Sequence, residues 1–222
     1  GHTGRLGAYA EKAAKTGCFV ICMGGGGREK WASVVPFGGI NPIMSTNPFA
    51  FSMPGSEVNP VSSDFAISTI AAGKIAVAKA NNTPLPDGAI IDSDGHASRN
   101  PDDFYAGGAL LPAAGPKGSG MGIIAELVGN AMLGSALEFN WLIICMRVDA
   151  FQPISQYKVA VSKLSKQVRK SSPATGHQKV LMPGDLEEKK YQDCVNSGYL
   201  SVSNNIAKLL IDAAQSVGQK GW

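Results

Sequence analysis

The first candidates for chemistry are His2 and Arg5, which stand three residues apart at the start of the chain. An imidazole can exchange a proton with a hydroxyl or keto oxygen, and a guanidinium can bind a carboxylate through two parallel hydrogen bonds. The pair therefore suits hydride-transfer chemistry on a small hydroxy acid. A solvated surface histidine at the end of a chain is the simpler alternative for His2.

A second candidate is the glycine-rich run from Gly115 to Gly120, which contains Pro116 and Lys117 and precedes a predicted helix. The first N–H groups of a helix have no partner within the helix, and this end carries partial positive charge. With Lys117 beside it, the run predicts an anion site for the pyrophosphate of a cofactor. An ordinary helix entry with a solvated lysine explains the same residues.

Asp64 is a third candidate, because it ends a predicted strand and precedes a turn that is rich in Ser and Thr. A carboxylate at this position could contact the ribose or the nicotinamide of a cofactor. It could equally serve as the N-cap of the next helix, since Asp is among the preferred N-cap residues. The sequence leaves both interpretations open.

Two common nucleotide-binding motifs are excluded. The Rossmann fingerprint Gly-x-Gly-x-x-Gly places the pyrophosphate on the start of a helix, but Glu29 stands where the third glycine is needed and Pro36 follows too soon. Gly24 to Gly27 are therefore predicted to form a mobile loop. Gly73 and Lys74 lack both the upstream glycine and the following hydroxyl of a P-loop, which argues against phosphoryl transfer.

Helical and strand-like segments alternate along the chain, which predicts an α/β fold with a mixed sheet and flanking helices. The segment 81–107 is rich in turn residues and is predicted to be a surface excursion. We expect one incomplete catalytic unit, with a sheet-containing cofactor-binding core at 1–150 and a helical part at 151–222. The predicted helices are 6–15, a segment ending near 80, 119–133, 156–168, 185–196 and 204–217; the predicted strands are 18–22, 46–54, 61–65 and 141–148.

Three of these helices carry an apolar stripe that is expected to face the core. The stripes are Leu6, Tyr9, Ala10 and Ala13; Met121, Ile124, Ala125, Val128 and Met132; and Ile206, Leu209, Leu210, Ala213 and Val217.

Composition indicates a soluble globular protein of the cytoplasm. Hydrophobic residues make up 44% and charged residues 17% of the 222 residues, which excludes disordered and fibrous classes. The net charge of +3, without a long basic run, gives no indication of nucleic-acid binding. The four cysteines suit buried free thiols in a reducing compartment. No signal peptide opens the chain, and no apolar run approaches the roughly 20 residues that would span a membrane.

Five motifs in order resemble the malate/L-lactate dehydrogenases of the second type, with relatives that reduce sulfopyruvate, diketogulonate or cyclic imino acids. The family's patterns are a His-x-Gly segment, PFGG followed by TNP, DxATS followed by GK, LLP followed by a glycine-flanked lysine, and PGE. In this chain they correspond to residues 1–7, 35–39 with 46–48, 64–68 with 73–74, 110–112 with 115–118, and 182–185.

The resemblance implies a fold unrelated to Rossmann proteins, with an extended NAD or NADP, and a homodimer in which both subunits build the cleft. It implies that His2 is the acid/base on the hydroxyl or keto oxygen of a 2-oxoacid or cyclic imino acid. The other positions that match the family's motifs are the cofactor-contacting Asp64, Phe65, Ala66, Pro116, Lys117, Gly184 and Asp185, and the site-supporting Thr46 and Asn47.

The chain also departs from the family's pattern. The family carries an upstream helical arm with a Ser-His-Gly…Arg motif that helps to bind substrate; the chain starts after that point, and its first residue is Gly1. Single residues differ as well: Met23 stands for Asn, Ile67 for Thr, Ser119 for an aromatic residue and Asp185 for Glu, and the join from Gly134 to Trp141 is short. We therefore expect an N-terminally incomplete member that catalyses poorly or not at all.

Two other classes of function remain open at this point. One is a cofactor-binding or dimerisation remnant without catalysis. The other is a binding module for a ligand that is not a nucleotide. Binding of NADH without turnover would favour the first, and failure to bind either NADH or NADPH would favour the second.

Overall fold

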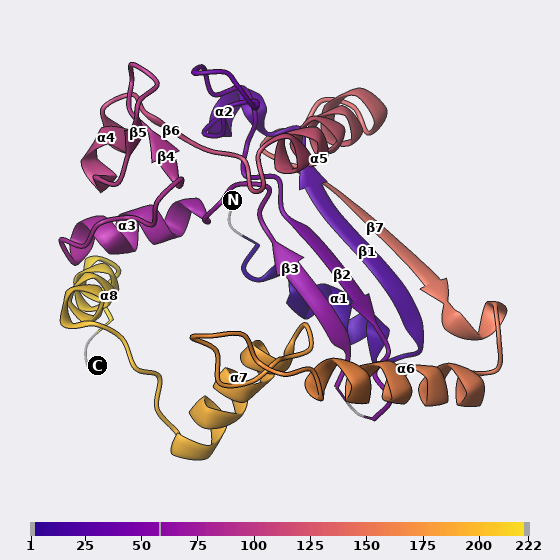
Figure 1. The fold of residues 1–222 in the computed structure, drawn as a ribbon. Helices are drawn as coiled ribbons and strands as arrows, with labels where there is room; N and C mark the ends of the chain where they lie inside the picture. Colours follow the sequence, from indigo (N-terminus) through magenta and orange to yellow (C-terminus); the bar gives the residue numbers. More distant parts are fainter. Residues whose placement is uncertain (1–2, 58, 220–222) are drawn as a thin grey trace.

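The computed structural model describes residues 3–57 and 59–219. Its centre is a four-stranded sheet in the order β3-β2-β1-β7, and each neighbouring pair is antiparallel (Figure 1). A Rossmann fold is built on a mostly parallel sheet, so the predicted non-Rossmann α/β architecture is confirmed. The sheet is antiparallel, however, and not mixed as predicted. The strands are β1 (Cys18–Gly25), β2 (Phe49–Met53), β3 (Val61–Phe65) and β7 (Asn140–Arg147).

Helix α1 (Leu6–Ala14) covers one face of this sheet. Its buried residues Leu6, Ala10 and Ala14 form one cluster with β1 and β2 residues, and the alanines allow a close approach of helix to sheet. Tyr9 does not join them, contrary to the predicted stripe. Its side chain is exposed and its hydroxyl donates to the carbonyl of Thr3 over 3.0 Å.

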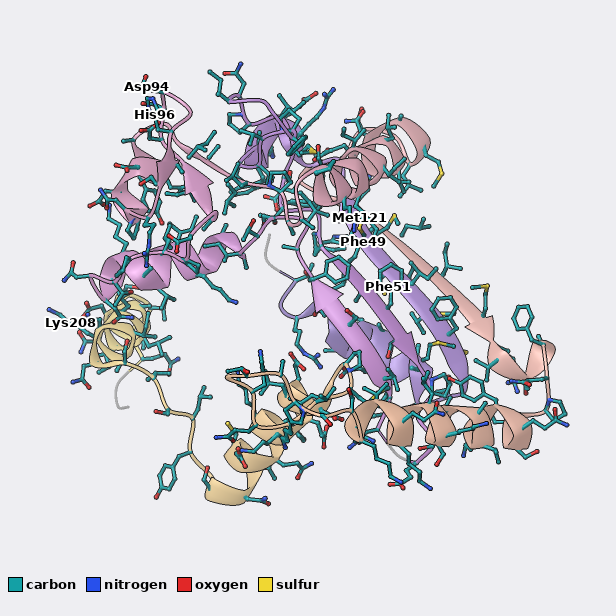
Figure 2. The ribbon with its side chains drawn as sticks, viewed as in Figure 1. Phe49, Phe51, Asp94, His96, Met121 and Lys208 are labelled. Atoms are coloured by element: carbon teal, nitrogen blue, oxygen red, sulfur yellow. The ribbon has the colours of Figure 1, made fainter. Side chains whose placement is uncertain are left out.

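Helix α5 (Pro116–Glu126) continues as the π-helical segment η1 (Leu127–Met132), and both contact β1. The predicted stripe on this helix is wrong for two of its five residues. Met121 packs on the core and Ala125 is buried, whereas Ile124 and Met132 are exposed. Figure 2 shows Met121 close to Phe49, and Phe51 further along the sheet. The helix packs through its small residues, because its backbone lies almost in contact with β1.

That close approach also explains the glycine run that was expected to be mobile. Gly24 and Gly25 are the last residues of β1 and pair with Trp141 and Asn140. A Cβ atom on Gly25 would lie 1.9 Å from the carbonyl oxygen of Ala125, and one on Gly129 would lie 2.1 Å from the carbonyl carbon of Gly25. The glycines therefore allow the backbone of α5–η1 to cross β1 at close range. The loop prediction is wrong for Gly24 and Gly25.

The predicted excursion at 81–107 contains regular structure of its own. A three-stranded sheet in the order β5-β4-β6 packs beside α3 and α4 (Figure 1). The elements are α3 (Ala72–Ala80), β4 (Ile90–Ile91), β5 (Ala97–Ser98), α4 (Pro101–Tyr105) and β6 (Ala109–Leu110). Residues of this lobe, among them Ile75, Leu85 and Ile90, share the largest core cluster with Phe49 of the main sheet, so lobe and sheet are joined through one core.

The C-terminal part is helical, as predicted, but lies mostly on the surface. The Tyr157 hydroxyl is buried and donates to the carbonyl of Pro54 over 2.8 Å, which ties α6 to the end of β2. Helix α8 lies beside α3, where the Asn205 amide donates to the carbonyl of Ala80 (Figures 1 and 2, with Lys208 marking α8). Neither α7 nor α8 has a buried residue, so the expected burial of the α8 stripe is wrong. The elements are η2 (Val148–Ala150), α6 (Ile154–Arg169), α7 (Asp185–Ser197) and α8 (Asn204–Ser216); the short α2 (Arg28–Trp31) was not predicted.

Among the described residues, no helix is both long enough and apolar enough to cross a membrane.

Candidate functional site

A cavity of about 740 Å³ lies along the outer side of β3. Its wall comes from five places in the sequence: the start of the chain, the Thr46 segment, β3 with the residues up to the first turn of α3, Phe139 with Trp141 near the start of β7, and the turn before α7 with the first residues of that helix. Six of the residues predicted for the site line it, namely Arg5, Thr46, Asp64, Phe65, Ala66 and Gly184. Segments far apart in the sequence are thus brought to one cavity.

Asp64 links β3 to the start of α1. Its Oδ2 accepts a hydrogen bond from the backbone N–H of Gly7 over 2.7 Å. That N–H belongs to the first turn of α1, where no side chain of the helix itself provides a cap. Asp64 therefore caps a helix, but the one before it in the sequence rather than the one after it. Asp64 also lines the cavity, so it takes part in both the helix cap and the cavity wall.

Arg5 lines the cavity but is held by another side chain. Its guanidinium donates to both carboxylate oxygens of Glu11, over 2.9 and 2.5 Å. This hydrogen bonding raises the pKa of Arg5 above its ordinary value, against the opposing effect of desolvation. A substrate carboxylate would have to compete with Glu11 for this guanidinium.

The turn before α7 closes the cavity at the outer edge of β3. The N–H of Ser62 donates to the carbonyl of Pro183 over 3.2 Å, and Gly184 has a φ of 95°. Asp185 does not line the cavity; it accepts from the N–H of Met182 over 2.9 Å and from the Arg169 guanidinium over 2.7 and 3.2 Å. The hydrogen bonds from Arg169 are the main reason that the pKa of Asp185 lies below its usual value. Asp185 thus holds the turn in place.

Thr46 and Asn47 take different positions. Thr46 lines the cavity, and its carbonyl accepts from the N–H of Ile67 over 2.9 Å. Asn47 is fully buried, and its amide donates to the carbonyl of Gly122 and to Oε1 of Glu126. The buried Glu126 also accepts from the N–H groups of Gly26 and Ser45 over 3.1 and 3.0 Å. Asn47 therefore does not line the cavity but stabilises the segment that carries Thr46.

The first turn of α3 is part of the wall that sequence reasoning did not assign. Ala72, Gly73 and Lys74 line the cavity, and no side chain caps this helix. Lys74 is exposed, and no ion pair of its side chain is found in the described part of the chain. The Gly73–Lys74 motif was the available signal: it was rejected as a P-loop and matched to the family's GK pattern, but it was given no role in the site.

Pro116 and Lys117 lie outside this cavity. Both are exposed at the first turn of α5. The preceding Gly115 lines a second cavity of about 490 Å³, and Thr69 lines both cavities. The structure thus places Lys117 next to a neighbouring cavity rather than the one that collects the other predicted residues.

His2 lies outside the described residues, so its position relative to the cavity stays a prediction. The residues that follow it, Thr3, Gly4 and Arg5, do line the cavity.

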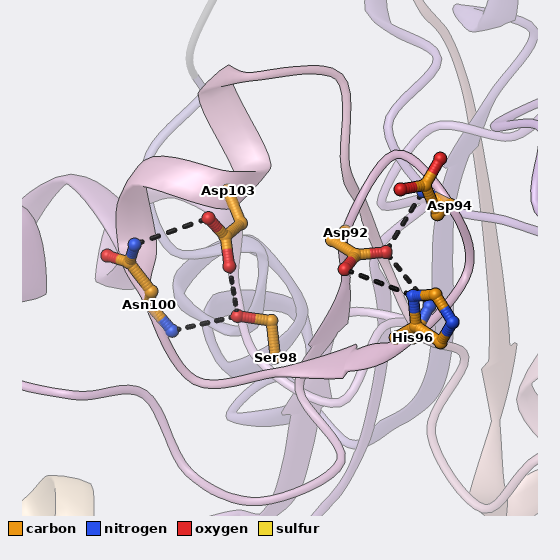
Figure 3. Close-up of polar contacts among 6 residues, drawn as sticks. All are labelled: Asp92, Asp94, His96, Ser98, Asn100 and Asp103. Atoms are coloured by element: carbon orange, nitrogen blue, oxygen red, sulfur yellow. Dashed lines mark hydrogen bonds and ion pairs between the residues drawn. The ribbon is translucent and has the colours of Figure 1, made fainter.

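Of the described residues, Asp92, Asp94 and His96 form a group with a spacing that could hold a metal ion. Figure 3 shows that the bonds within it are those of a tight turn. Asp92 accepts from the N–H groups of Asp94 and His96 over 3.0 and 2.9 Å, and the pKa of Asp92 is lowered chiefly by the His96 bond. In the same view, Ser98 and Asn100 contact Asp103 at the start of α4. These polar groups are therefore explained by hydrogen bonds that stabilise the loop itself.

Comparison with known proteins gives one family. The sequence model of a family described as malate/L-lactate dehydrogenase matches residues 1–210. The chain is 28% identical over 228 residues to a ureidoglycolate dehydrogenase (NAD(+)) of Escherichia coli (strain K12), which covers 96% of this chain and 63% of that protein. It is 39% identical over 110 residues to a Δ1-pyrroline-2-carboxylate/Δ1-piperideine-2-carboxylate reductase of Pseudomonas putida, covering 49% of this chain and 32% of the reductase.

The fold gives the same result. The solved structure of a sulfolactate dehydrogenase from Methanocaldococcus jannaschii superposes with a TM-score of 0.80 at 26% identity, over 99% of this chain and 65% of that one. The matched part is less than two thirds of each relative's length: 63% of the ureidoglycolate dehydrogenase, 65% of the sulfolactate dehydrogenase and 32% of the reductase.

Proposed function

Because this chain belongs to the malate/L-lactate dehydrogenase family, we propose that it binds NAD(H) or NADP(H) along β3 for hydride exchange with a small 2-hydroxy/2-oxo acid or cyclic imino acid. The observation that carries the proposal is the cavity of about 740 Å³. Its size falls within the range of about 300–1,000 Å³ that is usual for small-molecule sites.

The start of α3 suits the pyrophosphate of such a cofactor. Ala72 and Gly73 lie in the first turn, no side chain caps the helix, and Lys74 stands at the same end. Unpaired N–H groups, the positive end of the helix dipole and an ammonium group all favour an anion. A Cβ atom on Gly73 would meet no other atom within 4 Å, so the helix start is open to a ligand.

Other parts of the wall suit the uncharged parts of a dinucleotide. Phe65 offers an aromatic surface that is 38% exposed. Ser62 also lines the cavity, and its buried hydroxyl has no hydrogen-bond partner among the described residues. Asp64 and the Gly184 turn lie on the same side of β3, so we assign the cofactor contacts of Asp64, Phe65, Ala66 and Gly184 to one continuous surface. Asp185 would act through the turn that it holds.

A nicotinamide cofactor would supply the hydride. The protein would orient the substrate, exclude water and provide the proton at the substrate's oxygen or nitrogen. We assign that proton to His2 and carboxylate binding to Arg5, which would first have to leave Glu11. Thr46 and Asn47 would support the wall.

The test is a fluorescence titration with NADH and NADPH of the unmodified chain, Lys74→Ala and Lys117→Ala. We expect saturable binding by the unmodified chain and a roughly tenfold weaker affinity for Lys74→Ala, as befits the loss of one charge-assisted contact worth about 1.5 kcal/mol. A larger loss for Lys117→Ala than for Lys74→Ala would move the pyrophosphate to α5 and contradict this placement. No binding of either cofactor at millimolar concentration would sink the proposal.

A cofactor-binding or dimerisation remnant without turnover is the second candidate. One observation favours it: the Arg5 guanidinium is held by the Glu11 carboxylate. Assays with pyruvate, oxaloacetate and a cyclic imino acid, run beside the titration, separate the two. Binding without turnover supports the remnant, whereas turnover that His2→Ala lowers by about 10²–10⁴-fold supports the enzyme.

The same proposal includes the organisation and setting of the chain. We propose one catalytic unit, in which 1–150 supplies the sheet and the cofactor surface and 151–222 adds helices such as α7 with its Gly184 turn. We further propose that the protein forms a homodimer in the cytoplasm. The free thiols of Cys18, Cys22, Cys145 and Cys194 suit a reducing compartment. The predicted burial of these thiols holds for Cys22 and is wrong for Cys145, which is exposed.

A further inference from the structure

Two aromatic side chains line the cavity at a place to which the proposed function gives no role. They are Phe139, just before β7, and Trp141, the second residue of that strand. Their rings stack with centroids 5.9 Å apart and planes inclined by 29°, and both side chains are half-buried. The pair therefore presents an aromatic surface to a ligand in this part of the cavity.

The glycines at the end of β1 make room for both rings. A Cβ atom on Gly24 would lie 2.4 Å from Cζ3 of Trp141, and one on Gly27 would lie 2.9 Å from Cζ of Phe139. Neither distance leaves space for a side chain, so a larger residue at either position would displace a ring. The placement of the aromatic pair is thus fixed by the backbone on which it rests.

Trp141 stands at the end of the cavity where Arg5 is proposed to bind the substrate carboxylate. It packs against the cluster that contains Leu6, the residue after Arg5. Its strand partner Gly24 donates from its N–H to the carbonyl of Pro48 over 3.0 Å, and Pro48 lines the cavity as well. The indole therefore lies close to two other parts of the wall at this end.

The charges around Arg5 do not suit a substrate with two anionic groups. The pKa of Arg5 is raised chiefly by its hydrogen bonds to Glu11, and the charges of Glu11, Asp64 and Glu187 raise it further. Three carboxylates thus surround one guanidinium. Among the described residues of the wall, the other cation is Lys74, which the proposed function assigns to the pyrophosphate. A second carboxylate or a sulfonate on the substrate would therefore be repelled.

We infer that Trp141 is a specificity-determining residue that stacks on the ring of a cyclic 2-imino acid and favours this class over dianionic 2-oxoacids. The inference rests on the proposed function and names the substrate class for its site. A cyclic imino acid has one carboxylate for Arg5 and a ring nitrogen that is positively charged when protonated. The face of an indole attracts a cation, the nearby carboxylates stabilise it, and the ring carbons bury apolar surface against the indole.

The test measures the binding of two acids to the NADH complex by isothermal titration calorimetry. Piperidine-2-carboxylate and malate are both reduced, as is NADH, so no hydride passes between them and affinity is measured without turnover. We expect the unmodified chain to bind piperidine-2-carboxylate about tenfold more tightly than malate. Trp141→Ala should weaken the binding of piperidine-2-carboxylate by about tenfold and leave the affinity for malate unchanged.

Trp31→Ala is the matched control, because Trp31 is 49% exposed on α2 and does not line the cavity. It should leave both affinities unchanged. Four results would overturn the inference: equal affinities of the unmodified chain for the two acids, a preference for malate, no binding of either acid to a chain that binds NADH, or an equal loss for both acids in Trp141→Ala.

The comparison of the two acids on the unmodified chain holds even if Trp141→Ala folds poorly. Two milder variants test the aromatic face itself. Trp141→Phe keeps such a face and should bind piperidine-2-carboxylate more tightly than Trp141→Leu, which keeps only apolar bulk; equal affinities would contradict the inference. Failure of the unmodified chain to bind NADH would count against the proposed function, whereas a chain that binds NADH and prefers malate contradicts this inference alone.

Discussion

The two outer strands of the main sheet offer opposite surfaces. At β3, the outer residues are Ser62, Ser63 and Asp64, and the edge is covered by the Pro183–Gly184 turn. At β7, the middle of the strand is apolar, and its backbone makes no hydrogen bond to any described segment other than β1. Polar groups beside a cavity can orient a small ligand, whereas a bare apolar edge suits a second strand. We therefore assign ligand binding to the cavity along β3, which the start of β7 reaches only through Trp141.

The largest effect is expected where α5–η1 crosses β1, because this contact supports the β7 side of the sheet. A Cβ atom on Gly129 would lie 2.1 Å from the backbone of Gly25. Gly129→Ala should therefore destabilise the fold by about 3 kcal/mol, as overpacking of a tight contact does. Urea denaturation measures this free energy of unfolding.

Gly120→Ala is the matched control for that variant. Gly120 lies in α5, and a Cβ atom there would meet nothing within 4 Å. Alanine is the better helix former by about 1 kcal/mol, so this variant should be as stable as the unmodified chain or slightly more so. Equal destabilisation by both substitutions would show that the close approach of α5–η1 to β1 does not depend on Gly129.

A medium effect is expected at the turn that covers β3. Gly184 has a φ of 95°, a conformation that costs an L-residue about 1–2 kcal/mol. Gly184→Ala should relieve this strain by moving the turn, and so weaken NADH binding by about fivefold to tenfold. Gly198→Ala is the control, since Gly198 has a φ of 71° at the far end of α7 and does not line the cavity. It should cost similar stability and leave NADH affinity unchanged; equal loss of affinity in both would argue against a role for the turn in binding.

The smallest effect concerns pH at the same turn. The pKa of Asp185 is lowered, chiefly by hydrogen bonds from Arg169. A lowered pKa in the folded state means that the stabilisation is present above the unfolded value of about 3.9 and is lost as the pH falls through the folded value. Both partners are partly exposed, so the contribution should be below about 1 kcal/mol. The stability difference between the unmodified chain and Asp185→Asn should therefore shrink below about pH 4; a difference that grows on acidification would contradict the assigned cause.

How far the sequence predicts this molecule depends on how local each signal is. The strands at Cys18 and Val61 and the helices after Leu6 and Asp185 follow from local periodicity and caps, and the structure has them. The ordered motifs also predicted that Asp64, Thr46 and Gly184, far apart in the chain, would share one site, and all three line one cavity.

The misjudged elements depend on contacts between distant segments. Ile124 was expected in the core because apolar stripes usually face inward. The glycines of α5–η1 and β1 instead let two backbones meet, which turns Ile124 outward. Lys74 was given no role because that role depends on the start of α3 lining the same cavity as the turn at Gly184, which no local pattern encodes.

Hydrogen–deuterium exchange with and without NADPH tests the division between the two edges most directly. We predict that NADPH slows exchange in residues 62–74 and around Gly184, while exchange in residues 143–147 of β7, which do not line the cavity, does not change. Protection by NADPH confined to the start of α5 and to β7, with residues 62–74 unaffected, would contradict the account.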